Sequence, residues 1–357
     1  MSTRFPPARW PASARWVLLV GIALVLVLLM EMFHLPAALL LGPMFAAIFM
    51  AVNEASVRVP RPAFILSQSV VGLMMASVLP LDLFDEIARD WPIFVSGVLF
   101  TVLAAAVLGY FMTRAQLFPG TTAIWGSSPG AAAAMVLVSE SYGADMRLVA
   151  FMQYLRVACC ALVSTILARS LGLDPTAVQQ VDWFPPLDIA GAAMTLGLAV
   201  LAAFAGSRSR IPGGALLVPL MLGLVVKFTG VMPLVLPPWL LALSYAVIGF
   251  GVGLRFTHEV VRHAARTFPR VLGSIMILIG VCAGFGYLLH LVAGVDLLTA
   301  LLATSPGGAD TVAIIASSPS MNIDLPFVMA MQVARFIFVV LTAPALARYL
   351  STGARAG

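Results

Sequence analysis

Long apolar stretches separated by short polar segments follow one another along almost the whole chain. A membrane-spanning helix needs about 20 predominantly apolar residues. Ten stretches approach that length, and we expect each of them to form a transmembrane helix. They cover residues 16–33, 35–52, 63–79, 92–112, 147–168, 187–205, 213–231, 238–254, 269–290 and 325–347. The pattern predicts an all-α polytopic membrane protein.

Two further apolar stretches, 118–139 and 298–316, are interrupted in the middle. The first contains Gly-Ser-Ser-Pro-Gly at 126–130, and the second contains Thr-Ser-Pro-Gly-Gly at 304–308. Proline and paired glycines end helices. We therefore expect a re-entrant or discontinuous helix at each place instead of a straight span.

The second half of the chain repeats the first at a nearly constant spacing. The Ser-Pro-Gly at 128–130 recurs at 305–307, and the Met-Gln-x-x-Arg at 152–156 recurs at 331–335. Such a spacing is typical of an internal duplication. We predict about five transmembrane helices plus one broken or re-entrant helix per half. The predicted organisation is a cytoplasmic N-terminal segment at 1–15, a first membrane repeat at 16–170, an inter-repeat loop at 171–186, a second membrane repeat at 187–350 and a C-terminal tail at 351–357.

Composition agrees with a membrane location. Hydrophobic residues make up 61% of the chain and charged residues 10%, against about 45–50% and about 25% in soluble domains. A soluble protein of this length could not bury that much apolar surface, so the surplus must face lipid. The apolar run from Trp16 follows several arginines and precedes no small-residue cleavage site. We expect an uncleaved first span with its N-terminus inside.

Loop charges predict how the two halves are oriented. The charged residues of 80–91 are mostly acidic, whereas the equivalent loop at 255–270 is rich in arginine. Arginine and lysine are enriched in cytoplasmic loops. Equivalent loops of opposite charge therefore predict an inverted repeat, in which the halves cross the membrane in opposite directions. We expect a multi-pass protein of the bacterial inner membrane with both termini cytoplasmic.

The two breaks are candidate substrate-binding elements. Inverted repeats with paired broken helices are a transporter architecture, in which the ligand lies where half-helix ends converge. Ser128 and Ser305 are suitable N-caps followed by proline, so each break is expected to aim free backbone N–H groups inward. The alternative is a kink needed only for packing. The predicted ligand-contacting residues of the breaks are Ser127, Ser128, Gly130, Ser305 and Gly307.

Two arginines lie deep inside predicted spans. Arg156 and Arg335 are each some nine to ten residues from the start of their spans, with Gln153 and Gln332 three residues earlier on the same helical face. An arginine at that depth is costly and marks a functional position. Facing inward, these four side chains are candidates for binding an anion. The alternative is that the arginines satisfy loose carbonyl groups at the breaks, and the two roles can coexist.

Asp310 distinguishes the second half from the first, because Ala133 occupies the equivalent position. With Thr311 it is a candidate proton or coupling-ion site. It is equally a candidate ion-pair partner of Arg335, and the sequence leaves these interpretations open.

The sequence contains few signs of an enzyme or a metal centre. The three cysteines lie in apolar stretches without metal-ligand spacing, and no histidine pair has such spacing with a carboxylate or cysteine. No phosphate loop or nucleophile elbow occurs. We expect no catalytic residues, no metal and no cofactor. The longest hydrophilic stretch is only about 16 residues, so we expect no nucleic-acid partner.

The duplicated Ser-Pro-Gly breaks, the Met-Gln-x-x-Arg spans and the duplicated proline-bounded leucine segments resemble the AbrB family of bacterial membrane proteins. The resemblance covers residues 16–350 or so. Labels that accompany this family are transition-state regulator, regulator of gene expression and ammonia monooxygenase. The sequence argues against a DNA-binding protein, and it lacks the clustered histidines that a copper monooxygenase needs.

The predicted function is secondary transport of a small, anionic solute. The layout is similar to that of citrate and glutamate carriers, an analogy at the level of the fold alone. The alternative is a membrane-embedded regulator or sensor that binds a solute without moving it, and an enzyme is the third and disfavoured interpretation. The expected partners are the solute and the lipid bilayer. Homodimers are common in such folds, although nothing in the sequence requires one.

Overall fold

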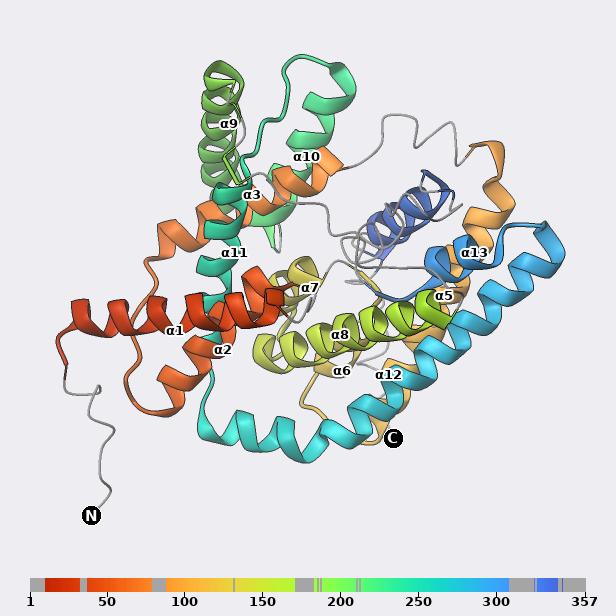
Figure 1. Cartoon of the computed structure of the whole chain (residues 1–357), viewed down its shortest axis with the longest axis horizontal. Coiled ribbons are helices and arrows are strands. Elements are labelled where there is room, and N and C mark those ends of the chain that lie inside the picture. The colour runs from red at the N-terminus through yellow and green to blue at the C-terminus, as the bar shows by residue number, and fades with distance from the viewer. Residues whose placement is uncertain are drawn as a thin grey trace. The chain divides into compact units, whose positions relative to one another are not determined.

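The chain is all-helical wherever the computed structural model describes a regular element (Figure 1). The described residues are 10–32, 37–78, 88–130, 132–170, 183–184, 186, 188–209, 211, 213–307, 324, 326–339 and 342. The chain divides into two compact units, one formed by residues 1–78 and 180–263 and the other by residues 79–179 and 264–357. Each unit thus combines segments from both halves of the sequence, so the units do not follow the predicted repeat boundaries.

The helices of the first unit come from three consecutive segments of each half. They are α1 (Ala12–Met32), α2 (Ala38–Val52), α3 (Arg61–Val78), α9 (Ile189–Arg208), α10 (Gly214–Thr229) and α11 (Pro238–Gly253). The second unit contains the long helices and the short broken ones. They are α5 (Trp91–Arg114), α6 (Thr122–Ser127), α7 (Ala132–Ser139), η2 (Glu140–Tyr142), α8 (Met146–Ser170), α13 (Leu297–Thr304) and the helix Pro326–Val339. Helix α12 (His258–Ala293) runs from the first unit into the second.

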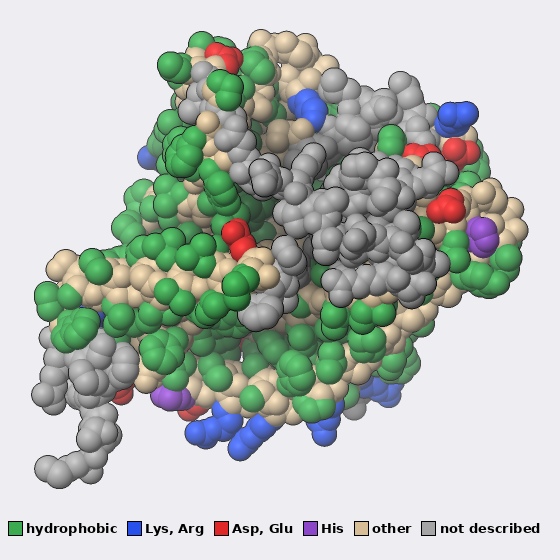
Figure 2. Space-filling model, in the orientation of Figure 1, with side chains coloured by type: hydrophobic (Ala, Val, Ile, Leu, Met, Phe, Trp, Pro, Cys, Tyr) green, Lys and Arg blue, Asp and Glu red, His purple; other side chains and the backbone are tan. Residues whose placement is uncertain are grey.

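All ten predicted spans coincide with helices, the last of them over Pro326–Val339. Five helices, α1, α5, α8, α9 and α12, are long and apolar enough to cross a membrane, and four shorter apolar helices accompany them. Many of their apolar side chains are exposed, as at Val17 (74%) and Leu28 (65%) of α1. Figure 2 shows hydrophobic side chains over much of the visible surface. The chain is therefore an all-α polytopic membrane protein, while the number of complete crossings stays a prediction.

The predicted loop at 255–270 is wrong for most of its length. The connection ends at Thr257, and residues 258–270 form the first third of α12. Val260, Ala264 and Thr267 are buried at positions i, i+4 and i+7, which is the pattern of an amphipathic helix. Arg262, Arg266 and Arg270 lie on the exposed side of this helix, and Arg255 is exposed in the connection before it. Basic side chains line the first part of the helix in Figure 2.

Glycines let the helices of the first unit pack closely in two equivalent places. A Cβ added at Gly72 of α3 would lie 2.5 Å from the carbonyl oxygen of Leu216 in α10, and one added at Gly249 of α11 would lie 2.6 Å from that of Leu40 in α2. Both carbonyls belong to the residue three positions before a helix-internal proline. Close packing at small residues is typical of membrane helices. Each half thus contributes a glycine helix that packs on the proline helix of the other.

Candidate functional site

Helix α6 stops at the first break because its chain turns out of helical geometry at Ser128. This residue has φ −57° and ψ 125° and forms the C-cap of α6. Its hydroxyl donates to the carbonyl of Ile124 at 2.8 Å. The prediction that Ser128 is an N-cap is therefore wrong, because Ser128 ends α6 and its hydroxyl bonds backward to that helix. Helix α7 is described from Ala132 onward.

Gln153 and Arg156 of α8 satisfy the carbonyl groups that the first break leaves free. The Gln153 amide nitrogen donates to the carbonyls of Trp125 (2.7 Å) and Ser128 (3.0 Å). The Arg156 guanidinium donates to the carbonyls of Ser127 (3.1 Å) and Ser128 (2.8 Å) through Nη1 and to that of Gly130 (3.5 Å) through Nη2. Nη2 also donates to the Gln153 side-chain oxygen at 2.7 Å. Arg156 therefore has the structural role that the sequence left open, in which it satisfies free carbonyl groups at the break.

Gln332 and Arg335 make the equivalent bonds at the second break. The Gln332 amide nitrogen donates to the carbonyls of Leu302 (2.9 Å) and Ser305 (3.3 Å). The Arg335 guanidinium donates to the carbonyls of Ser305 (2.7 Å) and Gly307 (3.2 Å), and to the Gln332 side-chain oxygen. Ser305 has φ −53° and ψ 129°, almost the values of Ser128. The sequence repeat is therefore also a repeat of backbone shape and of hydrogen bonds.

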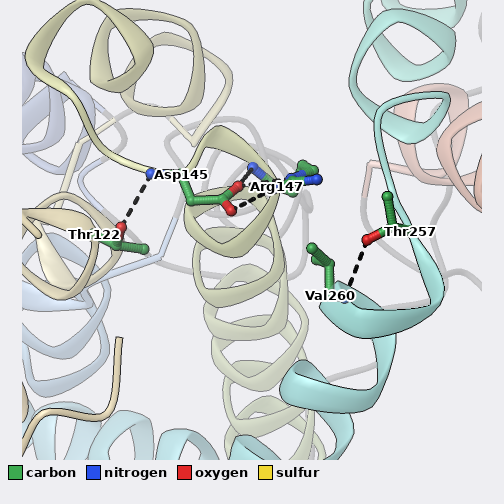
Figure 3. Close-up of polar contacts among 5 residues, drawn as sticks. All are labelled: Thr122, Asp145, Arg147, Thr257 and Val260. Atoms are coloured by element: carbon green, nitrogen blue, oxygen red, sulfur yellow. Dashed lines mark hydrogen bonds and ion pairs between the residues drawn. The ribbon is translucent and has the colours of Figure 1, made fainter. Parts of the chain in front are cut away.

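The starts of the two half-helices are held by a second duplicated contact, which the sequence analysis missed. The backbone N–H of Asp145 donates to the hydroxyl of Thr122 in α6 at 3.0 Å (Figure 3). The N–H of Asp324 donates to the hydroxyl of Thr299 in α13 at 3.3 Å. The signal was available, because the two threonines lie 177 residues apart and the two aspartates 179. Each half-helix is fixed at both ends by the helix that carries the arginine.

Asp145 also caps α8 and pairs with Arg147 at its first turn. Its carboxylate accepts from the Arg147 backbone N–H at 3.0 Å and lies 2.7 Å from the Arg147 guanidinium (Figure 3). Burial by itself raises the pKa of Asp145, but the hydrogen bonds and positive charge of Arg147 outweigh that effect and lower the pKa below its ordinary value of 3.8. The ionised carboxylate thus stabilises the start of the helix that carries Gln153 and Arg156.

Cys160 lies against the second break, so α8, which holds the first break, also contacts the second. It lies one turn after Arg156 on α8, on the same helical face. A Cβ added at Gly307 would lie 3.0 Å from the Cys160 Cβ, 3.6 Å from its sulfur and 3.5 Å from the Ser305 hydroxyl oxygen. The guanidinium groups of Arg156 and Arg335 lie within electrostatic range of each other. The structure therefore brings the two breaks and the two arginines together within the second unit, as the duplicated motifs predicted.

Both arginines are enclosed and carry one nitrogen without a partner. Arg156 is 1% exposed and Arg335 is 3% exposed. The Nε atom of each is buried and makes no hydrogen bond with any residue that the structure describes. The bonds of their Nη atoms go to backbone carbonyls and glutamine oxygens, and within the described ranges the one recorded ion pair is that of Arg147 with Asp145.

The coupling-ion candidates Asp310 and Thr311 lie outside the described residues. In the part of the chain that the structure describes, no three histidine, cysteine, aspartate or glutamate side chains form a group that could hold a metal ion.

Comparisons with known proteins place the sequence in one family. The family model described as "Transition state regulatory protein AbrB" matches residues 39–351. A protein of Escherichia coli (strain K12) named "Putative regulator AbrB" is 42% identical over 340 residues, which cover 95% of this chain and 97% of the relative. "Uncharacterized protein YhjN" of Bacillus subtilis (strain 168) is 25% identical over 308 residues, covering 80% of this chain and 78% of the relative. No solved structure matches the chain. The chain belongs to the AbrB family.

Proposed function

We propose that this protein is a secondary transporter that moves a small anionic solute across the bacterial inner membrane. Three features support a transporter: apolar membrane helices, a duplicated sequence, and in each half a short helix that stops at a Ser-Pro-Gly. Transporters of this kind bind their substrate at discontinuous helices between repeats. The opposite charges of segments 80–91 and 255–270 favour an inverted orientation of the two halves.

The observation that carries the proposal is the pair of buried arginines. Each guanidinium carries a full positive charge, because arginine does not lose its proton in proteins. The half-helix ends that they cap supply a partial negative charge of about −0.5 each. About one positive charge is therefore left uncompensated by the described groups. A bound anion supplies the missing charge.

The site uses the ends of α6 and α13 differently from the sequence-based expectation. The arginines and glutamines occupy the free carbonyl groups of each break, so the breaks serve mainly to hold the guanidinium groups in place. Preorganised positive charges in a water-poor environment bind anions strongly. In our proposal Gln153 and Gln332 orient the arginines, and Ser127, Ser128, Gly130, Ser305 and Gly307 form the frame.

Asp310 and Thr311 are our candidates for coupling transport to a proton or another cation. An isolated carboxylate in an apolar environment tends to bind a proton, because desolvation disfavours its charged form. Asp310→Asn is expected to fold and bind solute normally but to lose pH-dependent uptake. If Asp310 instead pairs with Arg335, the variant loses stability and Arg335→Gln partly restores it.

The proposal is tested by a ligand screen followed by an uptake assay. Purified protein is heated with a panel of small anions, small cations and neutral solutes, and the unfolding temperature is measured. We expect anions alone to raise it, and those anions to accumulate in proteoliposomes that contain the protein. Stabilisation by cations or neutral solutes alone, or a stabilising anion that is not taken up, would contradict the proposal.

A membrane-embedded regulator that affects gene expression is the second candidate. The name of the Escherichia coli relative favours it. A sensor and a transporter share the same binding site but differ in its access. A transporter exposes the site to each side of the membrane in turn, whereas a sensor need open it to one side alone. Labelling of a site cysteine from both sides supports transport. We propose no enzymatic activity for this chain.

A further inference from the structure

The hydrogen bonds that Arg156 already makes limit the contacts that it can offer to a ligand. A guanidinium has five N–H groups. Four of those of Arg156 are committed to oxygens of Ser127, Ser128, Gly130 and Gln153. The Nε–H alone is left, and it is buried without a partner in the described part of the chain. Arg156 therefore cannot form the paired, side-on contact that arginine usually makes with a carboxylate.

Arg335 is held in a similar way at the other break, where three of its four Nη–H groups have a partner among the described residues. Its Nη atoms donate to Ser305, Gly307 and Gln332, and its buried Nε atom has no hydrogen-bond partner among the described residues. The two free Nε–H groups belong to equivalent positions of the two halves. Because Cys160 contacts the second break one turn from Arg156, these groups lie on neighbouring parts of one site.

We propose that one monocarboxylate anion binds between the two halves, accepting a hydrogen bond from Nε of Arg156 and another from Nε of Arg335, beside the thiol of Cys160. This inference rests on the proposed anion-binding function and names its substrate class. A carboxylate offers two acceptor oxygens, one for each Nε–H. Its single negative charge matches the one positive charge that the half-helix ends leave uncompensated. A dianion exceeds this match, and a halide is a single acceptor that lacks two oxygens.

The three cysteines allow a direct test. Cys159→Ala with Cys282→Ala leaves Cys160 as the single thiol of the chain. Its rate of modification is measured in proteoliposomes with an anionic and a cationic thiosulfonate reagent, each normalised to the rate with free 2-mercaptoethanol. A positive site raises the local concentration of the anionic reagent, so its normalised rate should be at least about tenfold higher. A variant that keeps Cys159 alone, with Cys160→Ala and Cys282→Ala, is the matched control and should show no such preference.

Protection identifies the ligand. Acetate, propionate and pyruvate are added at constant ionic strength, with sodium chloride and sodium succinate as comparisons. We expect the monocarboxylates to slow modification of Cys160 severalfold and the chloride and succinate salts to leave it unchanged. Gln332→Glu, which places a carboxylate beside Arg335, should abolish both the protection and the preference for the anionic reagent. Arg335→Lys keeps the charge and should retain the preference while weakening the protection.

The outcomes separate this inference from the proposed function. Equal normalised rates, no reaction of Cys160 with either reagent, or equal protection by chloride or succinate would overturn the monocarboxylate site. If the preference of Cys160 for the anionic reagent disappears only when Asp310 is ionised, Asp310 is the counterion of the arginines. This result also overturns the monocarboxylate site. Protection by a monocarboxylate that is never transported would retain the site and refute the transporter. Uptake of an anion that does not protect Cys160 would refute the monocarboxylate site and retain the transporter.

Discussion

At the scale of single residues, each break is a place where an interrupted helix leaves carbonyl groups without partners. The last turn of a helix has such unpaired carbonyls, and burying them is costly. One glutamine and one arginine satisfy these groups in each half. Because the described residues leave their Nε atoms without a partner, the same arginines can hold the structure together and bind a ligand.

Replacing an arginine at a break by lysine should destabilise the protein even though the charge is kept. Lysine is a single point donor and cannot serve carbonyls spread across the break. We expect Arg156→Lys and Arg335→Lys to cost about 1.5–3 kcal/mol for each charged hydrogen bond that is not remade. Thermal unfolding in detergent measures the loss. The exposed Arg114, which contacts Tyr110 at 3.3 Å, provides the control Arg114→Lys, which should unfold like the wild type. A large loss in one arginine variant and none in the other would contradict the equivalence of the breaks.

The Asp145–Arg147 pair predicts a pH dependence of stability. A carboxyl whose pKa is lower in the folded state stabilises that state above its unfolded pKa, and this contribution disappears as the pH falls through the folded pKa. The pKa of Asp145 is lowered below 3.8. Asp145→Asn should therefore cost about 1 kcal/mol or less at pH 7, since the pair is partly exposed, and nothing at a pH below the folded pKa. Unfolding temperatures across pH 7 to pH 3 measure this. If Asp145→Asn remains less stable than the wild type in acid, the Asp145–Arg147 pair is not responsible for the loss of stability.

At the scale of helices, prolines and glycines determine how the elements pack. Gly72 and Gly249 lie against backbone carbonyls of the proline-containing helices, where a side chain has no room. The same pair of residues was visible in the sequence as a match at a spacing of 177 residues. Its reciprocal arrangement, with each glycine on the other half's proline helix, could not be read from the sequence because spacing does not reveal which helices are neighbours.

Alanine at either glycine should destabilise the helix packing to a similar degree. The added Cβ would lie 2.5 Å from the Leu216 oxygen or 2.6 Å from the Leu40 oxygen, so the helices must move apart. We expect Gly72→Ala and Gly249→Ala to cost roughly 1–3 kcal/mol. Gly273 of α12 is the control, because nothing lies within 4 Å of its added Cβ. Gly273→Ala should be neutral or stabilising by about 0.5–1 kcal/mol. Denaturant-dependent unfolding in detergent distinguishes them, and equal effects at all three sites would refute the packing argument.

Sequence patterns located the helices well and their ends poorly. The ten apolar stretches all correspond to helices, since lipid requires continuous apolar surface and satisfied backbone groups. The helical nature of residues 258–270 was missed because charged side chains on one face concealed the buried stripe of Val260, Ala264 and Thr267. The duplicated Gln and Arg residues were found from their motif. Ser128 was assigned to the wrong helix end because a Ser-Pro pair fits both an N-cap and a helix stop.

At the scale of the whole molecule, the opposite charges of two equivalent segments predict an inverted repeat with both termini cytoplasmic. In a cysteine-free variant, single cysteines at positions 85 and 266 and at each terminus would be labelled with an impermeant reagent in intact and permeabilised cells. We expect position 85 to react from outside and position 266 and both termini to react only after permeabilisation. Labelling of positions 85 and 266 from the same side would refute the inverted orientation.

Solute counterflow tests the central claim most directly. Proteoliposomes are loaded with an excess of the unlabelled monocarboxylate that best protects Cys160 and are diluted into a trace of the same labelled compound. A carrier with alternating access accumulates the label transiently above its equilibrium level, whichever ion it is coupled to. We predict this overshoot for the wild type and the Gly273→Ala variant, and its loss in Gln332→Glu. A protein that binds the anion but produces no overshoot would contradict the account.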